Sequence, residues 1–184
     1  MRCAWAENDP LMQKYHDEEW GTPVHEDSKH FEFLILEGAQ AGLSWATILK
    51  RRNGYKKAFA NFNPKKVSEF TQKDVDRLLK DVGIIRNKLK IEPVVNNAKR
   101  FLEVQKEFGS FSKYIWGFVN TKPVVNIIKS VKDYKAISKE SDELSKDLKK
   151  RGFKFVGSTI MYAHMQATGL VNDHMVGCFR KKEV

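Results

Sequence analysis

The strongest constraint on the fold is the spacing of the apolar side chains, which recur every three or four residues along most of the chain. Ile91, Val94, Ala98 and Phe101 are one such series. This period is that of an α-helix with a buried face, whereas the alternation typical of half-buried strands is almost absent. The sequence therefore predicts an all-α fold, and 184 residues suffice for a single domain, 1–184, with its own core.

Capping residues and glycines divide this apolar pattern into separate helices. Asp9 followed by Pro10 predicts one helix start. Either Asp27 or Ser28 is expected to cap the next helix, which should run to about Ala41. The remaining predicted helices begin near Ser44 and Thr71 and cover residues 88–107, 142–150 and 159–167, with a loop at 120–125.

The net charge of +10 suggests a polyanionic partner, and nucleic acid is the first candidate. A lysine-rich solvated surface is the alternative explanation. The sequence contains neither an apolar run of signal-peptide type nor a stretch of about 20 apolar residues that could span a membrane. We therefore expect a soluble, cytoplasmic protein that makes no membrane contact.

Two cysteines and two histidines near the chain ends form a possible metal site. Cys3 and His16 lie near the start, and His174 and Cys178 lie near the end, four positions apart. Zinc prefers such ligands, and four of them form a closed, structural site that would clamp the termini together. The alternative is two free cysteines and two surface histidines. The other three histidines have no cysteine at ligand spacing and are interpreted as ordinary helix or surface residues: His25, His30 and His164.

An acidic residue inside an apolar segment is the main candidate for chemistry. Glu37 directly follows Ile35 and Leu36, where an unpaired carboxylate would be costly to bury. A pairing with a neighbouring arginine or lysine is the alternative to a functional role. The first 45 residues also hold four aromatic residues that suit a pocket for an extruded base, although each taken singly also fits a plain core position: Trp5, Tyr15, Trp20 and Trp45.

A buried carboxylate beside aromatic rings would attract a positively charged base. An alkylated purine such as 3-methyladenine is cationic while attached to its sugar, whereas normal adenine is neutral and gains less from the contact. Glu37 could also accept a hydrogen bond from an exocyclic amine, which would separate adenine-type from guanine-type lesions. We therefore interpret Glu37 mainly as a recognition group, and the sequence leaves open whether it also assists the chemistry.

Four separated motifs carry a family resemblance. They are Tyr15-His16-Asp17-x-Glu19-Trp20-Gly21-x-Pro23, Glu37-Gly38-x-Gln40-Ala41-Gly42-Leu43-Ser44-Trp45, Lys149-Lys150-Arg151-Gly152-Phe153-Lys154-Phe155-Val156-Gly157, and Asn172-Asp173-His174-x-x-Gly177-Cys178. In this order they closely resemble the DNA-3-methyladenine glycosylase I family, from Cys3 to Cys178. The resemblance implies a helix-hairpin-helix glycosylase fold, a structural zinc on the four ligands above, and a base pocket formed by Glu37 with the four aromatic residues.

The resemblance also implies contacts to DNA. The hairpin at 153–157 is expected to hold phosphates through its backbone amides, including the backbone at Gly157. Basic side chains beside it should assist, namely Lys149, Lys150, Arg151 and Lys154. The segment expected to approach the gap left by a flipped nucleotide contains Gln40, Gly42 and Leu43.

Two positions bear on the reaction type. Asn172 stands where many members of the wider superfamily have a catalytic aspartate, and Thr159 stands where bifunctional members carry a Schiff-base lysine. The resemblance thus implies a monomeric, monofunctional bacterial N-glycosylase that flips out 3-methyladenine, hydrolyses its bond to deoxyribose and leaves an abasic site in duplex DNA of the nucleoid. A non-enzymatic, zinc-stapled module that only senses damaged DNA is the alternative from another class.

Overall fold

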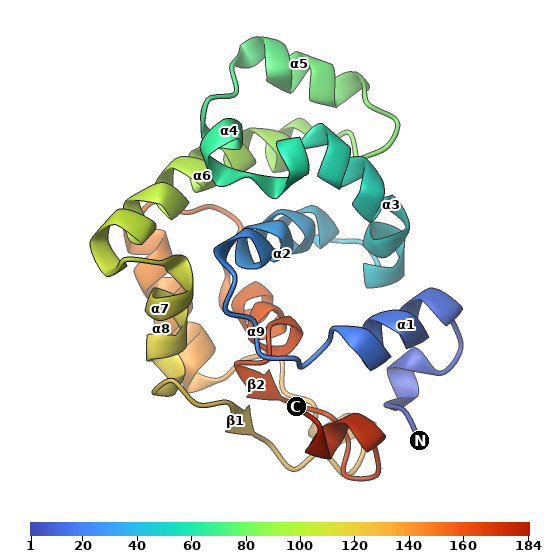
Figure 1. Cartoon of the computed structure of the whole chain (residues 1–184). Coiled ribbons are helices and arrows are strands. Elements are labelled where there is room, and N and C mark those ends of the chain that lie inside the picture. Colours follow the sequence, from blue (N-terminus) through green and yellow to red (C-terminus); the bar gives the residue numbers. More distant parts are fainter.

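The computed structural model describes residues 1–184, and helices follow one another along most of that length (Figure 1). The α-helices are α1 (Pro10–Glu18), α2 (Asp27–Gln40), α3 (Trp45–Ala58), α4 (Pro64–Ser68), α5 (Gln72–Lys80), α6 (Lys88–Phe108), α7 (Phe111–Trp116), α8 (Lys139–Lys150) and α9 (Ser158–Ala167). Short 3₁₀ segments are η1 (Ala4–Ala6), η2 (Ala60–Phe62), η3 (Gly117–Val119), η4 (Val131–Asp133) and η5 (Phe179–Lys182).

The strands are only two residues long. They are β1 (Val124–Val125) and β2 (Val171–Asn172), and they pair in parallel with Val124 opposite Val171. Strand β1 occupies the end of the segment for which the sequence predicts a loop. The mainly helical prediction is confirmed, and no helix combines the length and the apolar composition that crossing a membrane would require.

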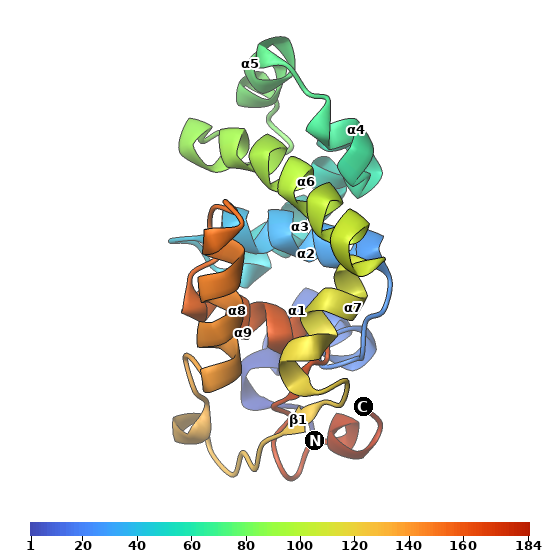
Figure 2. The same cartoon turned by 90° about the vertical axis from the view of Figure 1, so that its left-hand side faces the viewer.

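Helix α2 lies at the centre of the molecule. It packs against α3, α6, α7 and α9, as Figures 1 and 2 show. All residues from His30 to Glu37 are buried. A helix that is apolar on nearly all sides is stable in water only when neighbouring elements cover it. This central position also carries Glu32 and Glu37 into the interior, where each carboxyl group needs a polar partner.

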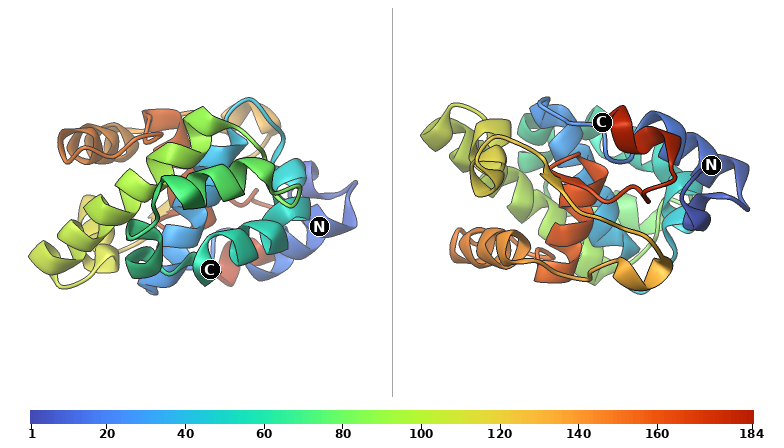
Figure 3. Two further views of the ribbon diagram at one scale, coloured as in Figure 1. Left: turned by 90° about the horizontal axis from the view of Figure 1, so that it is seen from above. Right: turned by 90° about the horizontal axis from the view of Figure 1, so that it is seen from below.

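The two chain ends lie on the same side of the molecule, opposite α5 (Figures 1 and 3). The amide of Phe179 donates to the carbonyl of Met1 at an N–O distance of 3.1 Å. A small apolar cluster, separate from the main core, includes Cys3, Tyr15 and Cys178. The first and last segments of the chain therefore fold as one unit.

Local capping explains several helix boundaries. The Asp9 carboxylate accepts a hydrogen bond from the Leu11 amide at 2.8 Å, and the Ser44 hydroxyl accepts one from the Thr47 amide at 3.2 Å. A capping box between Thr71 and Asp74 starts α5, as the sequence predicts. Each side chain supplies an acceptor to an amide that has no partner inside its helix.

The predicted cap of α2 is wrong. Glu26 occupies the N-cap position and makes no side-chain capping hydrogen bond. Asp27 lies inside the helix, and its carboxylate instead accepts hydrogen bonds from the amides of Phe111 and Ser112, both at 2.8 Å. These amides begin α7, so Asp27 caps a helix that is distant in sequence but adjacent in space.

Helices α8 and α9 are joined by a short turn. Gly152 and Phe155 both have positive φ angles, +88° and +56°, which reverse the chain direction. The side chain of Asn97, on α6, accepts a hydrogen bond from the Lys154 amide and donates one to the Lys154 carbonyl, each at 2.8 Å. The turn is thereby fixed to the body of the protein. The helix–turn–helix order expected for residues 145–167 is confirmed, although α8 begins three residues before the predicted start at 142.

Candidate functional site

A cavity of about 370 Å³ lies between α1, α2, α3 and α9. Its lining contains all five residues that the sequence analysis assigned to a base pocket: Trp5, Tyr15, Trp20, Glu37 and Trp45. It also contains residues that no motif indicated, which are Met12, Tyr134, Lys135, Ala163, Gln166 and Ala167. Gln40, assigned to DNA contact, lines the same cavity. The fold therefore brings together side chains from both halves of the chain.

The aromatic side chains form a continuous wall. The Trp5 and Trp20 rings meet edge to face with centroids 4.9 Å apart, and the Tyr15 and Trp45 rings lie 5.5 Å apart. Such tilted and edge-to-face contacts are favourable for aromatic pairs and keep the rings in fixed positions. The buried indole N–H of Trp45 has no hydrogen-bond partner in the protein, which leaves it as a donor beside the cavity.

Glu37 is the only carboxyl group in the lining, and it is only 4 % exposed. Its Oε2 atom lies 2.8 Å from Nδ1 of His164, while its Oε1 atom has no partner within the protein. Burial raises the pKa of Glu37 well above its usual range, because the low-dielectric interior disfavours the charged form. No arginine or lysine pairs with Glu37, so that alternative is wrong.

Two of the three histidines interpreted as ordinary are not at the surface. His30 and His164 are fully buried and lie 3.2 Å apart between Nδ1 and Nε2, whereas His25 is exposed. His164 contacts Glu37 although 127 positions separate them. No local pattern could reveal this pair, because the contact depends on how α9 packs against α2. Burial lowers the pKa of both His30 and His164 to about 3, which keeps the imidazoles neutral.

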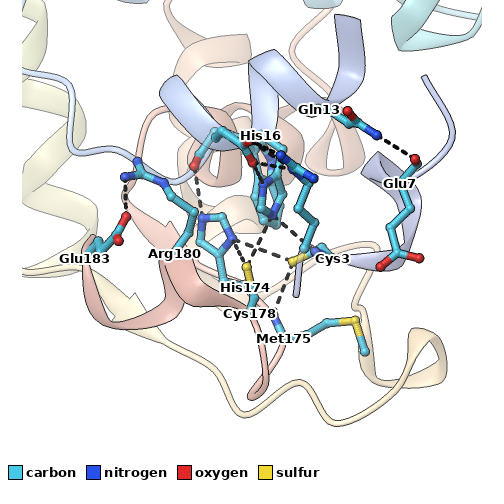
Figure 4. A network of polar contacts seen from close by, with 12 residues as sticks. Cys3, Glu7, Gln13, His16, His174, Met175, Cys178, Arg180 and Glu183 are labelled. Atoms are coloured by element: carbon cyan, nitrogen blue, oxygen red, sulfur yellow. Dashed lines mark hydrogen bonds and ion pairs between the residues drawn. The ribbon is translucent and has the colours of Figure 1, made fainter. Parts of the chain in front are cut away.

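The four predicted metal ligands converge at the joined chain ends (Figure 4). Cys3, His16, His174 and Cys178 are all buried, and their ligand atoms lie within 4.8 Å of one another. The Sγ atom of Cys178 is 3.4 Å from Nε2 of His16 and 3.5 Å from Nδ1 of His174. A tetrahedral zinc ion, about 2.3 Å from sulfur and about 2.0 Å from nitrogen, separates such ligands by about 3.5 Å. The cluster therefore has the composition and the dimensions of a metal site.

The surroundings of the two histidines support this interpretation. Nδ1 of His16 lies 2.8 Å from the Asp17 carboxylate, and Nε2 of His174 lies 3.0 Å from the carbonyl of Trp20. Metal-bound histidines commonly donate their second N–H in this way, which fixes the ring and the tautomer. Burial lowers the pKa of His16, and it lowers that of His174 to about 4, so both rings are held in the neutral form that binds a metal.

Gly21 allows the ring of His174 to approach the backbone. Its φ angle is +79°, and a Cβ atom at this position would lie 2.7 Å from Nε2 of His174. Any other residue would be strained by its backbone conformation and would also collide with the ring. The glycine in the motif that begins at Tyr15 thus has a direct steric cause.

The segment that joins α2 to α3, residues 41–44, is exposed beside the cavity. Gly42 has a φ angle of +78°, and Leu43 is 39 % exposed. The Lys90 ammonium group, on α6, donates to the carbonyls of Ala39 and Ala41 at 2.8 and 2.5 Å. This lysine fixes the end of α2, so an apolar side chain is presented to solvent on an anchored loop.

The turn before α9 offers a second exposed feature. The amides of Gly152, Phe153 and Lys154 are already bonded within the protein. The amides that follow Gly157 begin α9, whose N-cap makes no side-chain hydrogen bond. Lys149, Lys150 and Lys154 are exposed, whereas Arg151 is held by Glu107 and Asp147 and departs from the expectation for a free phosphate contact. A hollow of about 190 Å³ lies between this helix start and the loop at 41–43.

The family model described as methyladenine glycosylase matches residues 5–181 of the chain. The chain belongs to the methyladenine glycosylase family. The match spans most of the sequence and includes the aromatic wall, Glu37 and three of the four clustered ligands.

Named relatives of this family are similar over nearly their whole length. The chain is 49 % identical over 177 residues to the DNA-3-methyladenine glycosylase 1 of Escherichia coli strain K12, which covers 96 % of this chain and 95 % of that protein. It is 46 % identical over 177 residues to the DNA-3-methyladenine glycosylase of Haemophilus influenzae, with 96 % of each chain covered.

A solved structure of a family member has the same fold. The 3-methyladenine DNA glycosylase I from Staphylococcus aureus, determined to explain its recognition of 3-methyladenine, superimposes with a TM-score of 0.94 at 39 % identity. The match covers 98 % of this chain and 96 % of the other. The overall helical fold is therefore shared with that family member.

Proposed function

We propose that this protein is a monofunctional DNA glycosylase that flips 3-methyladenine out of duplex DNA and hydrolyses its bond to deoxyribose. The observation that carries the proposal is Glu37, a buried residue that lines an aromatic-walled cavity of about 370 Å³ and whose Oε1 atom has no partner within the protein. This volume falls within the range of roughly 300–1,000 Å³ found for small-molecule sites. The names of the family's relatives support the same base.

The aromatic wall would hold the extruded base by stacking. An extruded base loses its neighbours in the duplex, and the rings of Tyr15, Trp5 and Trp45 would replace them. Oε1 of Glu37 would accept a hydrogen bond from the exocyclic amine, which adenine-type bases have and which guanine-type bases lack at that position. The pocket would thereby recognise both the ring system and its edge.

Bond cleavage requires little acid catalysis for this substrate. The glycosidic electrons pass to a base that is already cationic, so the base leaves as a neutral molecule without first gaining a proton. The protein's contribution is to hold the nucleotide in a dry pocket and to stabilise the positive charge that develops on the sugar. Water then adds to the sugar and loses a proton to solvent, which leaves an abasic site. Thr159 supplies no amine for a covalent step, so the strand stays intact.

Zinc is the metal that the cluster of Cys3, His16, His174 and Cys178 fits best. Two thiolates and two imidazoles form a closed tetrahedral site, which leaves no position for a water or substrate. Bound zinc would supply no chemistry to the reaction. Its effect would be to hold η1 and α1, which carry Trp5 and Tyr15, against the C-terminal segment.

The turn between α8 and α9 is proposed to be the helix-hairpin-helix element that grips the DNA backbone. Free amides at the start of α9 and the exposed Lys150 and Lys154 suit phosphate binding without reading the base sequence. Leu43, presented on the exposed loop, would fill the space left by the extruded nucleotide, with Gln40 and Gly42 beside it. Residues of this loop and of the start of α9 line the same hollow, which supports a joint role in DNA binding.

Base release from methylated duplex DNA tests this function. The expected result is catalytic release of free 3-methyladenine, detected by chromatography, with strands that break only after alkaline treatment. Unmethylated DNA serves as the control. Stoichiometric binding without any released base would support the damage-sensing module instead, and strand breaks without alkali would contradict the monofunctional mechanism.

A further inference from the structure

Glu37 is one end of a chain of hydrogen bonds that leads away from the pocket. Its Oε2 atom lies 2.8 Å from Nδ1 of His164. Nε2 of His164 lies 3.2 Å from Nδ1 of His30, and Nε2 of His30 lies 3.1 Å from the carbonyl oxygen of Val24. All three side chains are buried, so no solvent molecule needs to be invoked to link them.

The far end of this chain fixes the positions of the protons. The carbonyl of Val24 can only accept, so Nε2 of His30 must carry a hydrogen. A neutral His30 then has a bare Nδ1, which must accept from Nε2 of His164. A neutral His164 in turn has a bare Nδ1 facing Oε2 of Glu37, and two acceptors at 2.8 Å would repel each other.

The number of protons that the three hydrogen bonds require leads to the same conclusion, whichever tautomers the two histidines adopt. The three contacts need three protons, whereas two neutral imidazoles and an ionised carboxylate supply only two. The third proton must lie on Glu37 or on a histidine. In either case the three side chains together carry no net charge.

We propose that Glu37, His164 and His30 form a proton-holding triad in which Glu37 is a neutral acid in the free protein, and the proton moves to His164 when a cationic base enters the pocket. His164 is then a positioning residue, and His30 sets its tautomer. The transfer breaks the O–H bond of Glu37 and forms an N–H bond at Nδ1 of His164, so no electron or atom leaves the triad. The proton transfer on binding of a cationic base rests on the proposed function, whereas the neutral Glu37 of the free protein does not.

This arrangement has a physical advantage over a permanent carboxylate. Keeping a charge on a buried carboxyl group without a charged partner is costly, and a neutral acid avoids that cost while the pocket is empty. A cationic base favours the carboxylate, whose Oε1 atom has no partner within the protein while its Oε2 atom contacts the new imidazolium. Neutral adenine gives no such driving force, so the negative charge forms only for the damaged base.

Few other ionisable groups act on the triad. Tyr15 from α1 and Lys135 from the loop after η4 line the same cavity as Glu37. Asp27 and His25 act on His30 from the beginning of α2 and the segment before it. Burial raises the pKa of Tyr15 well above its usual range. The Tyr15 phenol therefore keeps its own proton and does not provide the third proton of the triad.

Nuclear magnetic resonance of the full-length protein, labelled with ¹⁵N in histidine and ¹³C in the glutamate carboxyl group, tests the resting state directly. At neutral pH we expect His30 and His164 to carry hydrogen only on Nε2 and the Glu37 carboxyl carbon to resonate as a protonated acid. A His164 ring that carries hydrogen on Nδ1 beside an ionised Glu37 would overturn the proposal. Neither readout depends on glycosylase activity. A failure of the proposed protonation state can therefore be told apart from a failure of the proposed base release.

The same spectra test the transfer when ligand is added. The probe is the 3,9-dimethyladeninium cation, in which a methyl group replaces the sugar, and neutral 9-methyladenine is its control. With the cation, His164 should gain hydrogen on both nitrogens and Glu37 should become a carboxylate, whereas 9-methyladenine should change neither. Absence of binding by the cation, or binding without a change at His164, would contradict the transfer.

A variant pair separates the triad from a merely structural role. In His30→Phe, His164 loses the acceptor that fixes its tautomer, so Glu37 should ionise at neutral pH in the free protein. His25→Phe is a comparison variant, because His25 is exposed, stacks on Trp116 and makes no hydrogen bond to the triad, so that it acts on His30 only through its charge. An unchanged Glu37 resonance in folded His30→Phe would overturn the role of His30. If that variant does not fold, the wild-type tautomers still decide the proposal.

Discussion

Replacement of Glu37 by glutamine is the sharpest test of the pocket. The amide retains an oxygen that can accept from a base, and its NH₂ group can donate to Nδ1 of His164, so the buried contact at 2.8 Å has a neutral substitute. What the variant loses is the ability to become negative. We therefore expect the fold and the affinity for undamaged DNA to be retained while excision of the cationic base falls.

The size of the effect follows from the lost charge. A hydrogen bond to a charged group is worth about 1.5–3 kcal/mol, and two charges about 4 Å apart interact by about 4 kcal/mol at an effective dielectric constant of about 20. A loss of about 1.5–4 kcal/mol in the transition state lowers kcat/KM by between about tenfold and about a thousandfold. Release of 3-methyladenine from methylated DNA measures this ratio.

Glu32→Gln is the matched control. Glu32 is a second buried glutamate of α2, but its carboxylate is held by Arg52 at 2.6 Å and lies outside the lining of the cavity. The kcat/KM of Glu32→Gln should stay within about twofold of wild type, even if the variant melts at a lower temperature. Equal activity of Glu37→Gln and wild type, with both proteins folded, would remove Glu37 from recognition and from the mechanism.

The Glu37→Gln variant should also change how thermal stability depends on pH, and the direction of that change can be predicted. Burial raises the pKa of Glu37 in the folded protein above its unfolded value, so the folded state binds the proton more tightly. Its contribution to stability is complete below the unfolded pKa of about 4.3 and is lost as the pH rises through the folded pKa. Glutamine has no such loss, so the melting temperature of Glu37→Gln should rise relative to wild type as the pH increases above the unfolded pKa of about 4.3. A difference that does not vary with pH would refute this reasoning.

The remaining predictions concern the metal, the backbone and the DNA contacts. Elemental analysis should find one zinc ion per chain, and Cys178→Ser should lose both the metal and thermal stability; a metal-free wild type of full stability would contradict the clamp. Gly21→Ala should cost about 1–3 kcal/mol in chemical unfolding, because of its positive φ angle and the adjacent imidazole, whereas Gly117→Ala, where no atom lies within 4 Å of a Cβ, should cost far less. Lys150→Ala and Lys154→Ala should each lower the slope of log K for DNA binding against log salt concentration by about the amount expected for one phosphate contact. An unchanged slope would exclude a phosphate contact by that lysine.

The sequence by itself determined the helical architecture and the identity of several key side chains. A helix needs an apolar face at a fixed period and an acceptor at its start, and both are local properties that residues such as Asp9, Ser44 and Thr71 display in the sequence. The cysteines and histidines at the two ends could be recognised by their chemistry, and Glu37 by its apolar neighbours. Their roles stay predictions, although the structure places the ligands together and Glu37 in the cavity.

Only the tertiary structure decided which distant groups meet. Asp27 looks like the cap of its own helix, but its carboxylate bonds to amides at the start of α7 because the packing of α2 brings them within 2.8 Å. His164 looks like an ordinary helix residue, but it faces Glu37 across the contact between α9 and α2. Helical period and capping act over one or two turns, whereas a partner 127 positions away is selected by how whole helices pack. The protonation of the pocket therefore depends on the packing of α2 against α9.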